Sequence, residues 1–224
     1  MTLLVGLTGG IACGKSTVTA WLLARGVPVV DVDEVVRAMQ APGTPLVFEI
    51  GRAFPGVVKD GVLDRTALGD LIFSDHAERR RLNRLMQPHI IWGLFKAVGW
   101  HFLVGTPLVV MDAPTLFQYG LSAVCALTVV VAAPSDTQRA RIQARDGVDR
   151  PAADARIASQ MPLNAMRRRA NLVVENRGSV DDLKAELAAR VLPRLQKRVL
   201  LWRALSLPGL ALAAILLYVG RRLG

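Results

Sequence analysis

A glycine-rich segment near the start of the chain carries the clearest chemical signal. It reads Gly9-Gly-Ile-Ala-Cys-Gly-Lys-Ser-Thr17 and fits the phosphate-loop pattern G-x-x-x-x-G-K-[ST]. Glycines let consecutive backbone N–H groups curl around a phosphate, and the N-terminus of a following helix adds partial positive charge. In this pattern Lys15 reaches the β- and γ-phosphates of a nucleoside triphosphate, and Ser16 binds Mg²⁺. We expect the whole loop to bind the nucleotide, through Gly9, Gly10, Ile11, Ala12, Cys13, Gly14, Lys15, Ser16 and Thr17.

The loop alone does not say how the nucleotide is used. A GTPase carries an Asp-x-x-Gly switch and an Asn-Lys-x-Asp base reader, and neither string occurs in this chain. A transport or remodelling ATPase is usually larger. A small-molecule kinase has a helical insert that holds the acceptor and an arginine-rich lid that closes over ATP. The chain has room for an insert at residues 34–106 and an arginine-rich segment at 135–170, which favours the kinase plan.

The elements that position the loop are short apolar runs. Between them lie longer segments whose apolar residues have the spacing of a helix. The runs are Leu3–Leu7, Val27–Val32, Leu108–Met111, Thr128–Ala132 and Leu172–Val174. Continuous apolar strands alternating with helices predict a parallel sheet that is covered on both faces. We therefore predict an α/β fold with five parallel strands. An arginine-rich helical pair is expected at 135–171, and an amphipathic helix at 179–197.

Composition excludes several other classes of protein. Cys13 and Cys125 lie far apart and make neither a disulfide scaffold nor a metal-ligand spacing. The net charge of +10 is concentrated in two segments. Residues 135–172 hold eight arginines against four acidic residues, and residues 190–224 hold seven basic residues and no acidic one. Because the basicity is local, we do not expect a nucleic-acid partner. Arg167, Arg168 and Arg169 are expected to form a solvated face or a membrane-surface contact.

Several sequence blocks, in this order, resemble the dephospho-CoA kinase family over residues 1–192. After the loop come Val30-Asp-Val-Asp33 with Arg37, Pro42-Gly-Thr-Pro45 and Asp60-Gly-Val-Leu-Asp-Arg65. Then follow Met111-Asp-Ala-Pro-Thr-Leu-Phe117, Gln138-Arg-Ala-Arg141 with Arg145-Asp146, Gln160, and Glu175-Asn-Arg-Gly178. The resemblance implies a P-loop nucleoside-triphosphate hydrolase-like kinase fold with a helical acceptor subdomain and a lid. It also implies transfer of the ATP γ-phosphate to the ribose 3′-hydroxyl of dephospho-CoA, with Mg²⁺.

The resemblance assigns roles to the residues of the reaction itself. Asp33 is expected to orient the acceptor hydroxyl and take its proton, the work of a general base. The alternative is a solvated strand end at which Asp33 caps the next helix, while Asp31 points toward the loop or supports the metal site. Arg141 is expected to stabilise charge on the transferring phosphoryl group, with Arg145 and Arg150 as second candidates. Asp112, with Ser16, is expected to hold Mg²⁺.

The remaining assignments concern the two substrates. Arg145 and Asn176 are expected to contact ATP, with Asn176 at the adenine edge. Arg37, Arg65, His89 and Phe117 join Asp33 in binding dephospho-CoA, because arginine matches phosphate geometry. Two departures from the family stand out. Where the family has a His-Pro pair, this chain reads Met86-Gln-Pro-His89, so the role of the histidine falls either to His89 or to Gln87. Gln118 stands where the family has a glutamate. Two other functions remain as alternatives. The chain is a kinase for a nucleoside monophosphate or another small molecule, or it is an inactive, membrane-tethered scaffold that binds nucleotide.

The C-terminal part differs from a compact enzyme. Ala204 to Gly220 is an uncharged run of 17 residues with basic residues on both sides. As a helix it would be about 25 Å long, slightly short of the ~30 Å hydrocarbon core of a bilayer. We interpret residues 1–198 as the kinase domain and 199–224 as a membrane anchor. A packed terminal helix and a helical hairpin in the membrane interface are the alternatives. The anchor implies attachment to the mitochondrial outer membrane or the endoplasmic reticulum, with the catalytic domain facing the cytosol.

Overall fold

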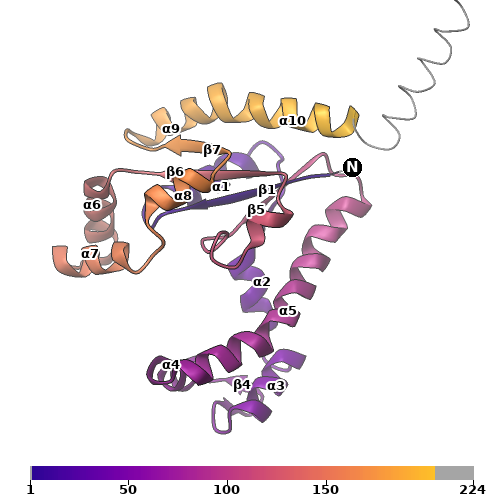
Figure 1. Cartoon of the computed structure of the whole chain (residues 1–224), viewed down its shortest axis with the longest axis vertical. Coiled ribbons are helices and arrows are strands. Elements are labelled where there is room, and N and C mark those ends of the chain that lie inside the picture. The colour runs from indigo at the N-terminus through magenta and orange to yellow at the C-terminus, as the bar shows by residue number, and fades with distance from the viewer. Residues whose placement is uncertain (1, 205–224) are drawn as a thin grey trace, which may run out of the picture. The chain divides into compact units, whose positions relative to one another are not determined.

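The computed structural model describes residues 2–204. They form two compact units. An α/β unit comprises residues 2–29 and 102–204, and a helical unit spans Val30–His101. Each is described by itself (Figure 1).

The α/β unit is organised on a parallel sheet of five strands, as predicted. The strand order is β2-β5-β1-β6-β7. The central strand β1 pairs in parallel with β5 and β6, and β6 pairs in parallel with β7. The strands are β1 (Leu3–Gly9), β2 (Val29–Asp31), β5 (Leu108–Asp112), β6 (Leu127–Ala132) and β7 (Leu172–Glu175). In this order the C-terminal end of β1 lies where ligands bind in open α/β sheets.

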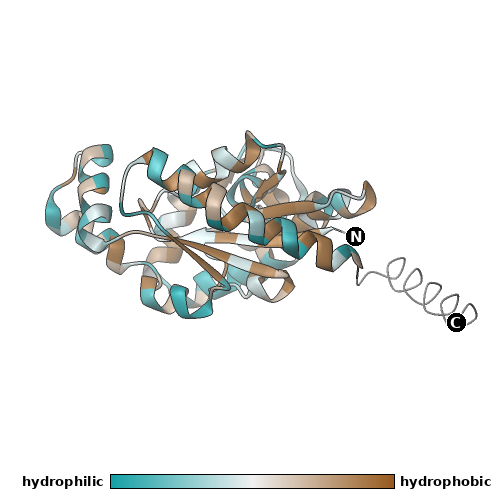
Figure 2. Ribbon diagram, turned by 90° about the horizontal axis from the view of Figure 1, so that it is seen from above, coloured by the Kyte–Doolittle hydropathy of each residue, from teal (hydrophilic) through white to brown (hydrophobic). Residues whose placement is uncertain are grey.

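The strands form because their apolar side chains are buried on both faces of the sheet. Every residue of β1 and β6 is buried, and Figure 2 shows the strands mainly in the brown of apolar residues. Leu3, Val5 and Leu7 alternate onto one face, where they belong to the same core as α1 (Lys15–Leu23) and the C-terminal helices. Continuous apolar runs of this kind need helices on both sides of the sheet.

Residues 135–169 form three helices, so the predicted helical pair was wrong. They are α6 (Ser135–Asp146), α7 (Arg150–Ala158) and α8 (Leu163–Arg169). Gly147 ends α6 with φ 65°, and the Asp149 side chain caps α7 by accepting from the Ala152 N–H. Pro162 comes directly before α8. These stop and start signals divide the arginine-rich stretch, which we call the lid segment.

The chain then runs back along the sheet as one long helical stretch. It comprises α9 (Val180–Glu186), a π-helical turn (Leu187–Val191) and α10 (Leu192–Ala204), so it continues beyond the predicted end at residue 197. Ser179 and Asp182 form a capping box at its start. Its buried side chains recur every four residues and anchor it to the core: Leu183, Leu187, Val191 and Leu195.

The helical unit has its own small core. Leu46, Ile50, Phe54 and Leu82 are buried together there. Its helices are α2 (Val32–Met39), α3 (Pro45–Ala53), α4 (Arg65–Ser74) and α5 (His76–Leu103), and the last residues of α5 belong to the α/β unit. A two-stranded hairpin, β3 (Val58–Lys59) and β4 (Val62–Leu63), was not predicted. Its Asp60-Gly61 turn has positive φ at both residues, as tight hairpins require. The remaining short element of the α/β unit is the 3₁₀ turn η1 (Leu121–Val124).

Between residues 2 and 204, no helix has both the length and the apolar composition of a membrane span. Residues 199–204 of the predicted anchor are the end of α10. Its residues 205–224 lie outside the described part of the chain.

Leu187 tests the contribution of the long helix to the α/β core. Its side chain is fully buried, and Leu187→Ala should lower the free energy of unfolding by about 2–5 kcal/mol, because it leaves a cavity. Urea denaturation followed by circular dichroism measures this change. The matched control is Leu200→Ala on α10, where the side chain is exposed and the expected change is within about 0.5 kcal/mol. Equal midpoints for the two variants would contradict this account of the core.

Candidate active site

The glycine-rich loop joins the end of β1 to the start of α1. Gly14 caps α1 in the left-handed region at φ 91°. A Cβ atom there would lie 2.4 Å from the Asn176 amide nitrogen, so only glycine fits. Ala12 also has positive φ, 57°. The first turn of α1 contains no acidic residue, which leaves its N-terminus with the positive end of the helix dipole uncompensated.

Three amide side chains from distant parts of the chain hold this loop in shape. The Gln138 side chain donates a hydrogen bond to the Ile11 carbonyl (2.7 Å), and the Ile11 N–H donates to the Gln160 side chain (2.7 Å). The Asn176 side chain donates to the Cys13 carbonyl (2.9 Å). Gln138 and Asn176 are themselves buried. Because the loop carbonyls have partners on the outside, the curled backbone is set before any ligand binds.

Gln138 and Gln160 were not predicted as site residues, although both lie in blocks that resemble the family. Their signal in the sequence was weak, because a glutamine in a polar helix usually faces water. Asn176 was predicted at the adenine edge. The structure places its amide against the loop backbone, and its contact with adenine stays a prediction.

Arg141 lies beside the loop on α6. It donates hydrogen bonds to the Ala12 carbonyl (3.2 Å) and the Asn176 side-chain oxygen (3.4 Å). The structure therefore brings a fixed positive charge to the edge of the phosphate loop. Such a charge can neutralise a phosphoryl group in transfer without reorganising at the moment of reaction.

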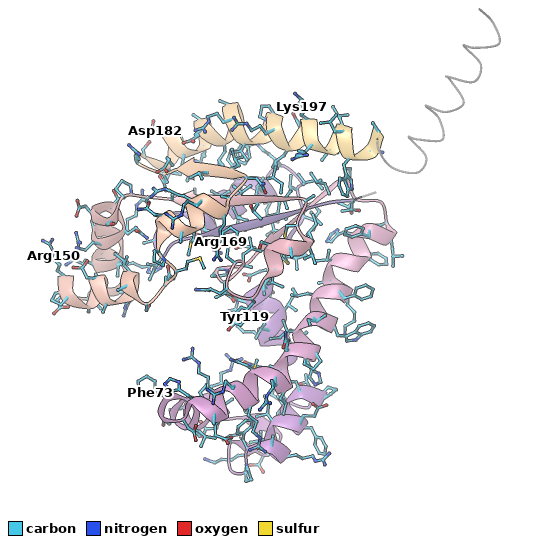
Figure 3. All side chains as sticks on the ribbon, in the orientation of Figure 1. Phe73, Tyr119, Arg150, Arg169, Asp182 and Lys197 are labelled. Atoms are coloured by element: carbon cyan, nitrogen blue, oxygen red, sulfur yellow. The ribbon has the colours of Figure 1, made fainter. Side chains whose placement is uncertain are left out.

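Arg145 and Arg150, the second candidates for the role of Arg141, are placed differently. Arg145 pairs with Asp146 through two hydrogen bonds of 2.7 and 3.0 Å, and Asp146 also contacts Arg156. The hydrogen bond from Arg145 is the main cause that lowers the pKa of Asp146. Arg150 stands at the outer end of α7 (Figure 3), where its guanidinium lies 3.9 Å from the Asp154 carboxylate. Neither side chain is held against the loop as Arg141 is.

Lys15 and Asp112 meet at the first turn of α1. The Lys15 ammonium donates to one oxygen of the Asp112 carboxylate (2.5 Å), and the Thr19 hydroxyl donates to the other (2.8 Å). Asp112 is buried at the end of β5, whereas Ser16 is exposed. A carboxylate and a hydroxyl are oxygen donors of the kind that Mg²⁺ prefers. The donor set of Ser16 and Asp112 therefore fits the predicted metal.

The Cys13 thiol takes no part in this polar arrangement. It is fully buried in the core, and this burial raises the pKa of the thiol above its ordinary value. The thiol therefore stays protonated at neutral pH and is a poor nucleophile. Cys13 contributes its backbone to the loop through its carbonyl, which accepts from Asn176.

Arg167 corrects the expectation of a solvated arginine face. Its guanidinium donates to both oxygens of Glu175, at 3.0 Å each, and to the side chain of Asn164 at 2.9 Å. This two-pronged pair ties α8 to the end of β7 and is partly shielded from water. Arg168 and Arg169 are exposed, so the solvated face is limited to them.

In the helical unit, Asp31 caps α2. Its side chain accepts hydrogen bonds from the backbone N–H groups of Asp33 (2.8 Å) and Glu34 (3.2 Å). The alternative that Asp33 is the cap was therefore wrong. Asp33 lies in the first turn of α2 and is exposed. Within the helical unit no hydrogen bond or ion pair holds its carboxylate, which is thus available to a ligand. The Arg37 side chain, one turn later, donates to the Asp33 carbonyl (3.4 Å).

The predicted acceptor residues each have a defined setting. Arg65 begins α4, directly after its cap residue Asp64. The His89 ring lies 3.0 Å from a carboxylate oxygen of Glu49. Phe117 is half-buried in the α/β unit after β5, and Gln118 beside it is exposed. Within the α/β unit the structure brings together the loop, Asp112, Arg141 and Asn176. Asp33, Arg37, Arg65 and His89 belong to the helical unit.

The sheet order, the loop and the lysine–carboxylate pair at its base define a P-loop kinase fold. Comparison with known proteins agrees with this class and narrows it. The dephospho-CoA kinase family matches the chain over residues 3–182. This protein belongs to the dephospho-CoA kinase family.

Individual relatives align with this chain over nearly their whole length. A dephospho-CoA kinase from Anaeromyxobacter dehalogenans is 45% identical over 194 residues, covering 86% of this chain and 92% of the relative. Among solved structures, the protein TT1252 from Thermus thermophilus is 37% identical with a TM-score of 0.74, covering 87% of this chain and 98% of that one. A dephospho-CoA kinase from Campylobacter jejuni shares the fold, with a TM-score of 0.60 at 20% identity, and covers 87% of this chain and 97% of that one.

The role of Asn176 in holding the loop gives a direct test. Asn176→Ala leaves the Cys13 carbonyl without its partner and should raise the Kd for Mg²⁺–ATP about 5- to 10-fold, or about 1–1.4 kcal/mol. Isothermal titration calorimetry measures the Kd. Asn83→Ala, an exposed site on α5, is the control and should bind ATP normally. An unchanged Kd in Asn176→Ala would show that the loop keeps its shape without this bond.

Proposed function

We propose that this chain transfers the γ-phosphoryl group of ATP to the ribose 3′-hydroxyl of dephospho-CoA, which gives coenzyme A and ADP. The observation that carries the proposal is the phosphate loop held by Gln138, Arg141, Gln160 and Asn176, in a chain of the dephospho-CoA kinase family. The A. dehalogenans relative of that name spans most of this chain.

The loop residues bind and orient ATP in this proposal. The backbone N–H groups of residues 10–14 and the start of α1 surround the phosphates. Lys15 leaves Asp112, or shares its charge with it, to reach the β- and γ-phosphates. Ser16 and Asp112 are the residues that would hold Mg²⁺, which supplies positive charge to the phosphate oxygens when bound. Arg145 and Asn176 are assigned to ATP through their place in the family's motifs.

The transfer itself needs one base and one fixed positive charge. Asp33 orients the 3′-hydroxyl of the acceptor and takes its proton. As that oxygen forms a bond to the γ-phosphorus, the bond from the γ-phosphorus to the bridging oxygen breaks and ADP leaves. Arg141 stabilises the charge on the phosphoryl group during this exchange, the role of arginines in phosphoryl transfer.

Arg37, Arg65, His89 and Phe117 are the residues assigned to the acceptor beside Asp33. Arg37 and Arg65 supply the bidentate guanidinium groups that suit the phosphates of dephospho-CoA. His89 and the half-buried ring of Phe117 complete the set. The contact between His89 and Glu49 holds the ring in place, which supports a positioning function for His89. Gln87 is the alternative for the role of the family's histidine.

Asp33→Asn tests the base assignment. We expect kcat with dephospho-CoA to fall by about two to four orders of magnitude, because the amide takes no proton, while the Kd for ATP stays within about twofold. A coupled assay for ADP measures turnover. The matched control is Glu34→Gln, the next residue of the same exposed turn, which should keep normal turnover. Near-normal kcat in Asp33→Asn would exclude the residue as the base.

We further propose that the apolar run at residues 204–220 attaches the enzyme to a membrane. The lack of any charge over 17 residues, with basic residues on both sides, supports this attachment. The catalytic domain would face the cytosol, at the mitochondrial outer membrane or the endoplasmic reticulum.

Extraction of cell membranes distinguishes an inserted segment from an electrostatic contact. The full chain should stay in the pellet after both high salt and alkaline carbonate, since apolar insertion does not depend on ion pairing. Leu212→Arg with Leu216→Arg should release it to the supernatant, because each arginine costs about 2.5–3.5 kcal/mol near the bilayer centre. Leu212→Ile with Leu216→Ile is the control. Release of the unmodified chain by salt alone would refute insertion.

A further inference from the structure

Three of the four tryptophans of this protein are exposed to solvent. Trp92 and Trp100 on α5 expose 58% and 63% of their surface, and Trp202 on α10 exposes 42%; only Trp21 is buried. Large aromatic side chains are normally buried. A contiguous group of exposed ones marks a surface that contacts something else.

The α5 residues form one continuous face of the helix. Trp92, Phe95, Trp100 and Leu103 are spaced by three, five and three residues, which places them along one side of the helix. All four are exposed. The Trp92 and Phe95 rings stack at 5.5 Å, and the Lys96 ammonium lies 6.0 Å from the Trp92 ring. We call these four residues the aromatic face.

The part of α5 that carries this face has no acidic side chain of its own. No acidic residue occurs between Arg79 and Met111, and none follows Glu186. The aromatic face is accompanied by Lys96, and α10 carries a series of basic side chains, of which Lys197 points away from the sheet (Figure 3). Those of α10 are Arg194, Lys197, Arg198 and Arg203. Aromatic rings combined with basic side chains are typical of surfaces that meet the interface of an anionic bilayer.

The α/β unit places the relevant chain ends at one edge of the sheet. The chain enters this unit from α5 at the N-terminal edge, where the Leu3 N–H donates to the Pro107 carbonyl (3.0 Å). The phosphate loop lies at the opposite edge. The helical stretch from Val180 to Ala204 starts near the loop and spans about 37 Å, against about 23 Å for β1. Ala204, where the apolar run begins, is therefore at the edge away from the loop (Figure 1).

We propose that the aromatic face of α5 is a membrane-contact surface that binds the interface of an anionic bilayer. This inference rests on the proposed membrane attachment through residues 204–220 and adds a second contact.

A bilayer fits the surface better than two other occupants. The apolar run could fold back onto the aromatic face, but it has no polar side, so its other side would remain in water. A second copy of this chain would bring basic surfaces together, because both partners carry the same excess of Lys and Arg. Anionic lipid headgroups match the charge, and acyl chains match the rings.

Quenching of tryptophan fluorescence by brominated lipid tests the proposal on the full chain. In one variant Trp100 is retained and Trp21, Trp92 and Trp202 are changed to Phe; in the matched control only Trp21 is retained. Each is added to vesicles of phosphatidylcholine and phosphatidylserine in which the phosphatidylcholine is brominated. We expect Trp100 emission to fall by roughly half and to shift to the blue, since interfacial rings approach the acyl chains, while Trp21 emission is unchanged. ADP formation with dephospho-CoA confirms that each variant is folded.

The possible results separate the two membrane proposals. Co-flotation with the vesicles but no quenching of Trp100 overturns the contact surface and leaves the anchor at 204–220 intact. Failure to float overturns both. Emission of Trp100 that is already blue-shifted without lipid shows that the chain's own terminal run or a second copy covers the face, and this also overturns the proposal.

Discussion

The site depends on one constraint: a short stretch of backbone must expose its N–H groups to phosphate while its carbonyls point elsewhere. Backbone carbonyls that lose their partners on burial cost about 1–3 kcal/mol each. In this protein the carbonyls of Ile11, Ala12 and Cys13 accept hydrogen bonds from Gln138, Arg141 and Asn176. The positive φ values of Ala12 and Gly14 are tolerated because these partners hold the turn from outside. The remainder of the α/β unit places these three hydrogen-bond partners beside the loop.

The partners of the loop come from elements that are far apart in the chain. Residues of α6, of the α7–α8 connection and of the end of β7 meet at a loop that begins at residue 9. Parallel strands make this possible, because the C-terminal ends of β1, β6 and β7 lie at the same edge of the sheet. Asp112 arrives at that edge in the same way, from β5. The sheet thus converts distant positions in the sequence into neighbours.

What was predictable from the sequence follows the range of the interactions. The phosphate loop, its strand and its helix are local patterns, and the five apolar runs appear as the five strands of the sheet. The partners of the loop depend on contacts more than 100 residues apart, such as Gln138 with Ile11, and no local pattern announces them. The cap of α2 shows the limit at short range. Asp31 and Asp33 are chemically alike, and only the backbone geometry decides that Asp31 accepts the helix N–H groups. Arg167 was misread for the same reason, because its partner Glu175 lies in another element.

Both polar groups of the Ile11 backbone are held by side chains from the lid segment. Its carbonyl is bound by a side chain from α6 and its N–H by a side chain from the segment before α8, so the lid segment and the loop share one small structural unit. Thermodynamic linkage is reciprocal. If these contacts strengthen nucleotide binding at the loop, bound nucleotide stabilises the same contacts of the lid segment by the same coupling free energy. Nucleotide occupancy is then readable as slower amide hydrogen exchange in α6 and α7, well away from the phosphates themselves.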